Sequence, residues 1–409
     1  MGNETEMLKS LLALGVELNQ VHDLDILMER ILERARHFTR ADAGSIYIRE
    51  GEQLEFSYTQ NQTLEARLPV GRKLVYTRFS IPVNEKSIAG HVAHTGSFLN
   101  IPDVYDLDPS LPFSFNKEMD EVSDYRTCSM LTLPLITVTG GVTGVLQVIN
   151  ARDDAGKVVA FSSEDEQLMF HFAALAAVAL ERAQMTRSTI LRIVKMAEMR
   201  DPKETGAHVS RVAGFSVALY EAWARNHGVD ADEIERNRDL FRMAAMLHDV
   251  GKISIPDSIL KKPGKLSPEE FDEMKTHTFL GAGLFYPFES PYDKACAEVA
   301  MSHHEKWDGT GYPGHVEMMT GKAIEGQTDE EGRAKARAGD EIPIFGRIVA
   351  LADVFDALSS RRAYKEKWEE GEVLSYIRKE SGKQFDPELV DLFFENIDEI
   401  RRIQILFES

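Results

Sequence analysis

Histidines that stand beside acids gather in the C-terminal half of the sequence. Glu204 and His208 are four residues apart, a spacing that puts both side chains on one face of a helix. His248 and Asp249 directly follow the apolar run 241–247, which predicts a buried helix that delivers both groups together. Imidazole and carboxylate suit divalent transition metals, so these pairs predict a metal site. Taken alone, each pair also fits a surface contact or an ordinary helix end.

Further candidate ligands follow along the chain. Residues 267–270 read Ser-Pro-Glu-Glu, a helix start with a capping serine and a proline in the first turn, and we expect this helix to carry His277. Adjacent helical residues point about 100° apart, so His303 and His304 can serve two different metal ions. Asp353 lies in an apolar segment, where a buried acid without a partner is costly, and a cation is expected to face it. By itself, a residue such as His277 is more often structural.

Five blocks of this half occur in a fixed order. They read Arg-Asp-Pro at 200–202 with Gly-Ala-His at 206–208, His-Asp-Val-Gly-Lys-Ile at 248–253, His277, His-His-Glu-Lys-Trp-Asp-Gly-Thr-Gly-Tyr-Pro at 303–313, and Asp-Val-Phe-Asp-Ala-Leu-Ser-Ser-Arg-Arg-Ala-Tyr-Lys at 353–365. In these blocks the chain resembles the HD-GYP family of cyclic-dinucleotide phosphodiesterases, over roughly residues 190 to 400. The Gly-Tyr-Pro block separates that family from other HD-domain hydrolases.

The resemblance implies a set of metal ligands and a number of ions. The implied ligands are Glu204, His208, His248, Asp249, His277, His303, His304 and Asp353. A glutamate at position 204 is similar to members with three metals, so three divalent ions are favoured over two. The resemblance also favours iron or manganese, because the ligand types by themselves accept several transition metals.

The same resemblance implies roles in catalysis and substrate binding. The implied catalytic residues are Lys252 and Asp249, and the implied substrate contacts are Lys252, Tyr312, Arg362 and Lys365. The implied reaction is in-line hydrolysis of a phosphodiester with the help of metal ions, while the cationic side chains hold phosphate oxygens. The implied substrate is cyclic di-GMP, which is opened to linear pGpG and/or cut to GMP.

Other functions stay open on the sequence. Some members of the family prefer 3',3'-cyclic GMP-AMP as substrate. A non-catalytic effector that binds a cyclic dinucleotide is disfavoured because none of the implied ligands is replaced. An HD-type nucleotide phosphohydrolase is disfavoured by the Gly-Tyr-Pro block and the downstream cations. Asp308 or Asp356 can assist proton transfer, although each also fits a structural role.

Two strand–turn–strand patterns indicate an α+β domain in the N-terminal half. Residues 45–48 and 54–58 flank a Glu-Gly-Glu turn and predict one β-hairpin. Residues 130–136 and 142–149 flank the pair at 140–141, whose glycines permit the positive φ of a tight turn. Helical spacing before residue 38 predicts helices that lead into this domain.

The order of helices, hairpin, central segment, second hairpin and long exit helix resembles the GAF domain family. Cyclic-nucleotide-binding members have an Asn-Lys and a Phe-x-x-x-Asp-Glu signature, which Asn150, Phe161, Asp165 and Glu166 match in part, with an alanine in place of the lysine. Acids at the start of a helix also interact favourably with its dipole, and we favour that interpretation of Asp165 and Glu166. The resemblance implies a small-molecule ligand of unknown identity.

One long helix is predicted from Ser163 to about residue 199. Leu168, Phe172, Leu175 and Ala179 follow each other at 4-3-4 spacing, which is typical of a two-stranded coiled coil. The pattern resumes towards the end of the helix at Ile190, Ile193 and Ala197. We therefore expect a parallel homodimer, in which this helix carries a signal from sensor to effector. The alternative is a helix that packs on its own domain.

The length of 409 residues predicts two or three domains, of which two is the working number. The fold class is multidomain: residues 1–19 form an N-terminal helix, 20–183 an α+β GAF-like sensor domain, 184–200 a signalling helix linker, and 201–409 an all-α HD-GYP catalytic domain. Within the last, the charged segment 320–340 lacks apolar periodicity. We expect a solvated, disordered insertion there, with a lid that alters specificity as the alternative.

Composition limits the partners. A formal net charge of -20 repels polymeric nucleic acid, so a phosphate ligand needs a local group of cations or metals. Cys128 and Cys296 lie in different predicted domains, which excludes a disulfide framework and a thiolate zinc site. No signal peptide and no apolar stretch of about 18 residues is present, so a cytoplasmic protein without a membrane partner is expected.

Overall fold

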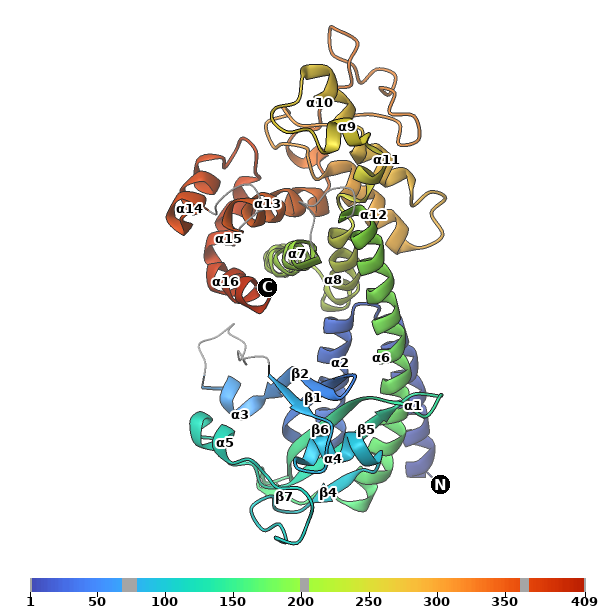
Figure 1. Cartoon of the computed structure of the whole chain (residues 1–409), viewed down its shortest axis with the longest axis vertical. Coiled ribbons are helices and arrows are strands. Elements are labelled where there is room, and N and C mark those ends of the chain that lie inside the picture. The colour runs from blue at the N-terminus through green and yellow to red at the C-terminus, as the bar shows by residue number, and fades with distance from the viewer. Residues whose placement is uncertain (1, 68–78, 199–205, 361–367, 408–409) are drawn as a thin grey trace. The chain divides into compact units, whose positions relative to one another are not determined.

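The computed structural model describes residues 2–67, 79–198, 206–360 and 368–407 (Figure 1). The chain divides into two compact units, which we call unit 1 (Met1–Arg187) and unit 2 (Ser188–Ser409). Helix α6 (Ser163–Glu198) is continuous across this boundary. No helix in the described ranges is both long and apolar enough to span a membrane.

Unit 1 is built on an antiparallel sheet with the strand order β3-β2-β1-β6-β5-β4, and β7 pairs with β6. The strands are β1 (Ala41–Glu50), β2 (Gln53–Asn61), β3 (Ser80–Pro82), β4 (Leu99–Ile101), β5 (Met130–Ile136), β6 (Val142–Arg152) and β7 (Val158–Val159). Both predicted hairpins are confirmed: β1 pairs with β2 and β5 pairs with β6. Gly140 has φ +84°, a conformation that glycine adopts at no steric cost.

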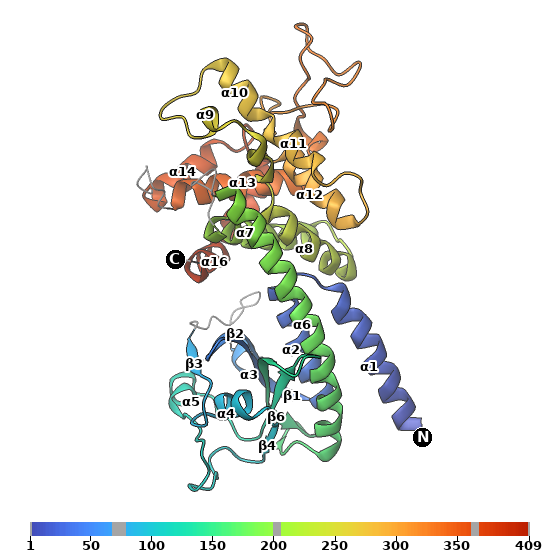
Figure 2. The ribbon, with the colours of Figure 1, turned by 45° about the vertical axis from the view of Figure 1, so that its right-hand side comes forward.

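The two faces of the sheet are covered by different helices (Figure 2). The helices of unit 1 are α1 (Gly2–Gln20), α2 (Leu24–Thr39), α3 (Gln62–Glu65), α4 (Ile88–Thr95), α5 (Glu118–Ser123) and the first part of α6. Ile46 and Leu146 point to the face packed by α1, α2 and α6, whereas Tyr47 and Val145 point to the face packed by α4. This alternation of neighbouring residues is the period of two that a strand imposes.

The apolar stripe of α6 is buried inside unit 1. Phe172 and Ala179 have no exposed surface and belong to its core, and Leu168 and Leu175 pack against that core. The stripe is therefore not the seam of a coiled coil between two chains. The same 4-3-4 spacing serves packing within a chain equally well, so sequence alone did not separate the two cases.

Among its described residues, unit 2 consists of helices and loops with only isolated β-bridges, as predicted. Its α-helices are the end of α6, α7 (Gly206–Asn226), α8 (Ala231–Met246), α9 (Asp257–Leu260), α10 (Pro268–Lys275), α11 (His277–Gly283), α12 (Pro291–Ser302), α13 (Ile344–Ser359), α14 (Glu370–Lys379), α15 (Pro387–Glu395) and α16 (Ile397–Leu406). Two 3-10 helices, Val250–Ser254 and Gly339–Glu341, complete the described elements. The core lies between α7, α8, α12 and α13, and contains Phe215, Phe241 and Ile348.

The charged segment 320–340 is mostly exposed but not without structure. Isolated β-bridges pair Val316 with Ala323 and Thr328 with Ala334, and several turns lie between them. The expectation of a disordered insertion is therefore wrong. Glycines and short polar side chains form these turns through local backbone hydrogen bonds. Such turns need no apolar periodicity, so its absence did not predict disorder.

Candidate active site

Seven of the predicted ligands lie together in unit 2. Within the described residues, possible ligand atoms lie within 4.8 Å of one another in two groups. The first ligand group is Asp249, His277, His303 and His304, and the second ligand group is His208, His248 and Asp353. The groups adjoin, because His248 Nε2 lies 3.3 Å from Asp249 Oδ2. His208, in turn, reaches Asp353 Oδ1 at 3.5 Å through Nε2.

The close packing of two helices brings Asp249 to His277. α8 ends at Met246, and His248 and Asp249 lie in the turn that precedes the 3-10 helix Val250–Ser254. A Cβ atom on Gly251 would overlap the backbone carbonyl of His277, so only glycine allows this 3-10 helix to approach α11 so closely. As a result, Asp249 Oδ1 lies 3.2 Å from His277 Nε2.

One expectation about helix position needs correction, and the place of His303 and His304 at a helix end is now defined. The capping box at Ser267 exists, but α10 ends at Lys275 and His277 is the first residue of α11. α12 ends at Ser302, so His303 caps the helix and His304 follows it, and whether the pair serves two ions stays a prediction. Their ring centroids are 4.1 Å apart, and both belong to the first ligand group.

Backbone carbonyls orient three of the histidines. The Nδ1 atoms of His248, His277 and His303 lie 2.8, 2.7 and 3.0 Å from the carbonyl oxygens of residues 245, 274 and 300. Because a carbonyl only accepts, each Nδ1–H donates to it, and the other nitrogen, Nε2, is the one left to bind a metal ion. This is the usual support of a metal-binding imidazole, and it directs Nε2 into the ligand groups.

The first ligand group places acceptors opposite acceptors. Burial lowers the pKa of His303 and holds the pKa of His304 well below its ordinary value, so both rings are neutral at pH 7. Asp249 is ionised: burial opposes this, but the positive charge of Lys252 is the largest effect that holds the pKa of the carboxyl well below its usual range. Asp249 Oδ1 nevertheless lies 3.5 Å from His303 Nε2. An anion that faces lone pairs in a buried site fits a cation between them.

The buried carboxylate of Asp356, one of the two candidates for proton transfer, supports His208. Asp356 Oδ2 lies 2.8 Å from His208 Nδ1, and the guanidinium of Arg211 donates to both oxygens of Asp356 at 2.6 and 3.0 Å. Burial opposes ionisation of Asp356, but the hydrogen bonds from His208 and Arg211 outweigh it and lower the pKa. A side chain held as an anion in this way orients the imidazole rather than transferring protons.

Two of the predicted substrate contacts are described. Lys252 Nζ donates to Asp249 Oδ2 at 2.6 Å, so its positive charge lies at the edge of the first ligand group. The ring of Tyr312 lies 4.8 Å from that of His304. Burial is the main reason that the pKa of Tyr312 is raised, and the phenol is a neutral donor at pH 7.

Three predicted site residues lie outside the described residues: Glu204, Arg362 and Lys365. Their roles stay predictions. Asp308 is exposed and accepts from the backbone N–H and the hydroxyl of Thr310, which is the structural alternative for this acid.

The carboxylate of Glu305 fixes the loop that carries Tyr312. This buried carboxylate accepts from the backbone N–H of Gly314 at 2.6 Å and from that of Arg337 at 3.2 Å. Burial raises the pKa of Glu305 to about 7, against the effect of these hydrogen bonds. Glu305 thus joins the two ends of the excursion that contains the segment 320–340.

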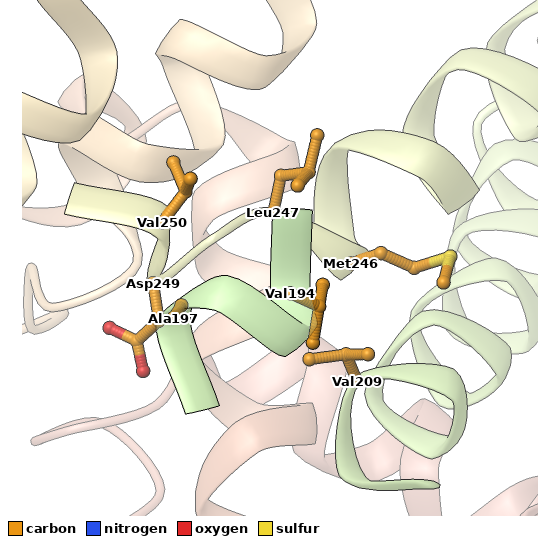
Figure 3. A pocket seen from close by; sticks show the side chains of 7 residues that line it. All are labelled: Val194, Ala197, Val209, Met246, Leu247, Asp249 and Val250. Carbon is orange, nitrogen blue, oxygen red and sulfur yellow. The ribbon is translucent and has the colours of Figure 1, made fainter. Parts of the chain in front are cut away.

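A small apolar cavity adjoins Asp249 on the side of α6 (Figure 3). Its lining residues are Val194, Ala197, Val209, Met246, Leu247, Asp249 and Val250. Val194 and Ala197 come from the last turns of α6, which here pack into the core of unit 2. The end of the long helix therefore lines the same cavity as the turn that carries Asp249.

Comparison with known families agrees with this architecture. The family model described as "GAF domain" matches residues 23–180, and the one described as "HD domain" matches residues 205–358. The chain consists of an α+β GAF domain, the long helix α6 and a helical HD domain.

Several curated proteins are similar to this chain. It is 36% identical over 221 residues to the 3'3'-cGAMP-specific phosphodiesterase 2 of Vibrio cholerae, a match that covers 54% of this chain and 37% of that protein. It is 34% identical over 284 residues to a cyclic di-GMP phosphodiesterase of the same species, a match that covers 68% of this chain and 51% of that protein. It is 41% identical over 212 residues to a cyclic di-GMP phosphodiesterase of Thermotoga maritima, a match that covers 52% of this chain and 50% of that protein. The chain thus spans about half or less of the length of these relatives.

Proposed function

We propose that this chain is a metal-dependent phosphodiesterase that hydrolyses cyclic di-GMP to pGpG and/or GMP under the control of its GAF domain. The observation that carries the proposal is the first ligand group, where ionised Asp249 faces the lone pairs of buried neutral histidines. The names of the relatives in Vibrio cholerae and Thermotoga maritima support the substrate class.

Two or three divalent transition-metal ions are proposed as cofactors, with iron or manganese favoured by the family resemblance. The seven residues of the two ligand groups would hold them, and Glu204 would complete a third position. Bound there, such ions supply an activated water near neutral pH and stabilise negative charge on the phosphoryl oxygens.

The side chains of this unit position the substrate. Lys252, held by Asp249, offers a positive charge to a phosphate oxygen at the edge of the first ligand group. Tyr312 offers its hydroxyl and the face of its ring from the opposite loop. Arg362 and Lys365 are proposed to hold the phosphates, on the family resemblance alone.

A second candidate substrate is 3',3'-cyclic GMP-AMP. The similarity to the Vibrio cholerae enzyme that carries this specificity in its name favours it, at an identity comparable to that of the cyclic di-GMP enzymes. A non-catalytic effector remains the alternative from another class of function, and it predicts binding without turnover.

Regulation is proposed to act through α6. A displacement of its last turns changes the packing around Val194 and Ala197, and hence the wall of the cavity next to Asp249. Replacement of Ala197 by leucine fills this cavity and is expected to change the rate while the amount of bound metal stays constant. An unchanged rate would contradict this route.

A parallel homodimer is proposed with a different surface from the one that the sequence suggested. Phe170, Val178 and Met185 project from one side of α6 and are 59%, 41% and 67% exposed. Leu12 and Val16 of α1 are 64% and 61% exposed. A double substitution of Phe170 and Met185 by glutamate is expected to give monomers in sedimentation. A small-molecule GAF ligand and a cytoplasmic location remain expectations from the sequence.

The test of the proposed function is anaerobic purification followed by metal analysis and assays with both cyclic dinucleotides. A His248→Ala and Asp249→Ala double variant is the control. We expect turnover by the wild-type chain, two or three metals per chain, and loss of both in the variant. Metal without turnover of either dinucleotide would contradict the enzyme and support the effector.

A further inference from the structure

A row of aromatic rings leads from the ligand groups to the surface of α10. The ring of Tyr312, next to His304, lies 6.0 Å from that of Phe271 in an edge-on arrangement. Phe271 is 44% exposed. Lys275 Nζ lies 4.9 Å from the centroid of Phe271 and 5.9 Å from that of Tyr312. An accessible aromatic face and a cation thus lie one ring beyond a candidate ligand.

Local sequence fixes this arrangement. The capping box at Ser267 starts α10, and Phe271 and Lys275 are four residues apart on one face of it. α10 ends at Lys275 and α11 begins with His277, so the same short segment that presents Phe271 also delivers a ligand. Lys275 is ion-paired with Asp272 at 2.7 Å, on an exposed side of the helix.

A cyclic dinucleotide has more to bind than the bond that is cut. Only one of its two phosphodiesters lies at the metal ligands at a time, which leaves two purines and a second phosphate to be held. Aromatic side chains bind bases by stacking whatever the base is, and a lysine attracts phosphate. In a chain with a net charge of -20, such a local cation matters for an anionic substrate.

We propose that Phe271 and Lys275 form, with Tyr312, an outer substrate subsite in which a purine stacks on Phe271 and the second phosphate displaces Asp272 from Lys275. This inference rests on the proposed function, since it concerns the same substrate. It assigns Phe271 and Lys275 to substrate binding and leaves the chemical step to the ligand groups.

The test compares a long and a short substrate. Methyl 4-nitrophenyl phosphate is a phosphodiester too short to reach from the ligand groups to Phe271. Phe271→Leu keeps an apolar side chain without a ring, and Lys275→Met keeps the stem without the charge. Each is expected to raise KM for the cyclic dinucleotide about 10-fold and to leave hydrolysis of the short diester unchanged. Phe271→Tyr and Lys275→Arg are expected to restore KM.

Matched controls exist in the same unit. Phe288 is 39% exposed, and Arg225, paired with Glu221, lies in the last turn of α7, at the other end of that helix from His208. Phe288→Leu and Arg225→Met are expected to leave both KM values unchanged.

The outcomes separate this inference from the proposed function. Dinucleotide turnover with an unchanged KM in Phe271→Leu overturns the outer subsite alone. A loss of short-diester activity in that variant also overturns it, because the ring then supports the Tyr312 loop instead. If the wild type turns over neither dinucleotide, the proposed function fails, and equilibrium binding of cyclic di-GMP to the metal-loaded chain decides. Weaker binding by Phe271→Leu supports the subsite, whereas equal or absent binding overturns it.

Discussion

Each unit buries a carboxylate among polar side chains, but the two carboxylates face opposite partners. Asp42 of unit 1 accepts from the hydroxyls of Thr63 and Tyr125 at 2.7 and 2.8 Å, and Arg152 Nη2 lies 2.7 Å from its other oxygen. Among the described residues, Asp249 of unit 2 has Lys252 as a cationic partner on one oxygen, while the other oxygen lies 3.5 Å from Nε2 of the neutral ring of His303, which is itself an acceptor. Burial of an acid therefore does not mark a functional site, whereas the kind of atom that faces it does.

The hydrogen bonds around Asp42 hold several segments of unit 1 together, and we call this network a structural clasp. Tyr125 also accepts from Asn150 Nδ2 at 2.9 Å, and Asn150 Oδ1 accepts from the backbone N–H of Cys128 at 2.7 Å. These bonds join β1, α3, β6 and the loop before β5. Asn150 belongs to the motif that suggested nucleotide sensing, and Asp165 of the same motif accepts from Ser162 at the start of α6. Both side chains have structural partners.

The largest expected effect comes from Asp249→Asn. Turnover should fall by more than about 100-fold, beyond the loss typical of residues that only support a metal ligand. In the metal-free chain, by contrast, the free energy of unfolding should fall by less than for the corresponding change at Asp42, because the amide oxygen can still accept from Lys252 and the other oxygen of Asp249 has no hydrogen-bond partner among the described residues. Denaturation in the presence of a chelator measures this. A strongly destabilised metal-free variant would place Asp249 in the same class as Asp42.

Asp42→Asn should give the reverse pattern. The amide leaves Arg152 without its anion, and its single oxygen can accept either from Arg152 or from Thr63 and Tyr125, which should lower the free energy of unfolding by about 2–3 kcal/mol. Hydrogen exchange in the full-length chain should show faster exchange in unit 1 and unchanged protection around the ligand groups. Turnover per folded molecule should stay within a factor of about two of the wild type, since the site itself keeps its partners.

The sequence predicted those parts of the molecule that depend on local patterns. Alternation and the glycines at 140–141 predicted the hairpins, and Ser267 predicted the start of α10. It did not predict that His277 belongs to the next helix, because helix ends depend on packing such as that of Gly251 against α11.

Partners that are distant along the chain were beyond local patterns. Residue types and spacing suggested the ligands and the family resemblance joined them into one set, but Arg211 and Asp356 are 145 residues apart and no spacing rule joins them. The stripe of α6 was predicted correctly as helical and apolar, but which surface covers it is a tertiary property. Likewise, Phe271 looks like an ordinary apolar helix residue until Tyr312 is seen beside it.

Asp356→Asn tests a buried acid that differs from both Asp42 and Asp249. Asp356 has hydrogen-bond partners on both oxygens, and one of these partners is the candidate metal ligand His208. An amide presents a weaker acceptor to His208 and disturbs the bidentate bond with Arg211, so metal affinity should fall by about 10- to 100-fold. Chelator competition measures this affinity. A loss of stability without a change in metal affinity would show that Asp356 has a purely structural role, like Asp42.

The smallest expected effects come from removing single hydroxyl groups, one next to Asp42 and one next to Asp356. Thr63 both donates to Asp42 and accepts from Arg152 Nη2 at 2.7 Å, so Thr63→Val should lower the free energy of unfolding by about 1 kcal/mol. Ser360 donates to Asp356 at 3.3 Å, but His208 and Arg211 still hold that carboxylate without it. Ser360→Ala should therefore change stability by less than about 0.5 kcal/mol. Equal losses in chemical denaturation would show that the network around Asp42 is no tighter than the one that supports His208.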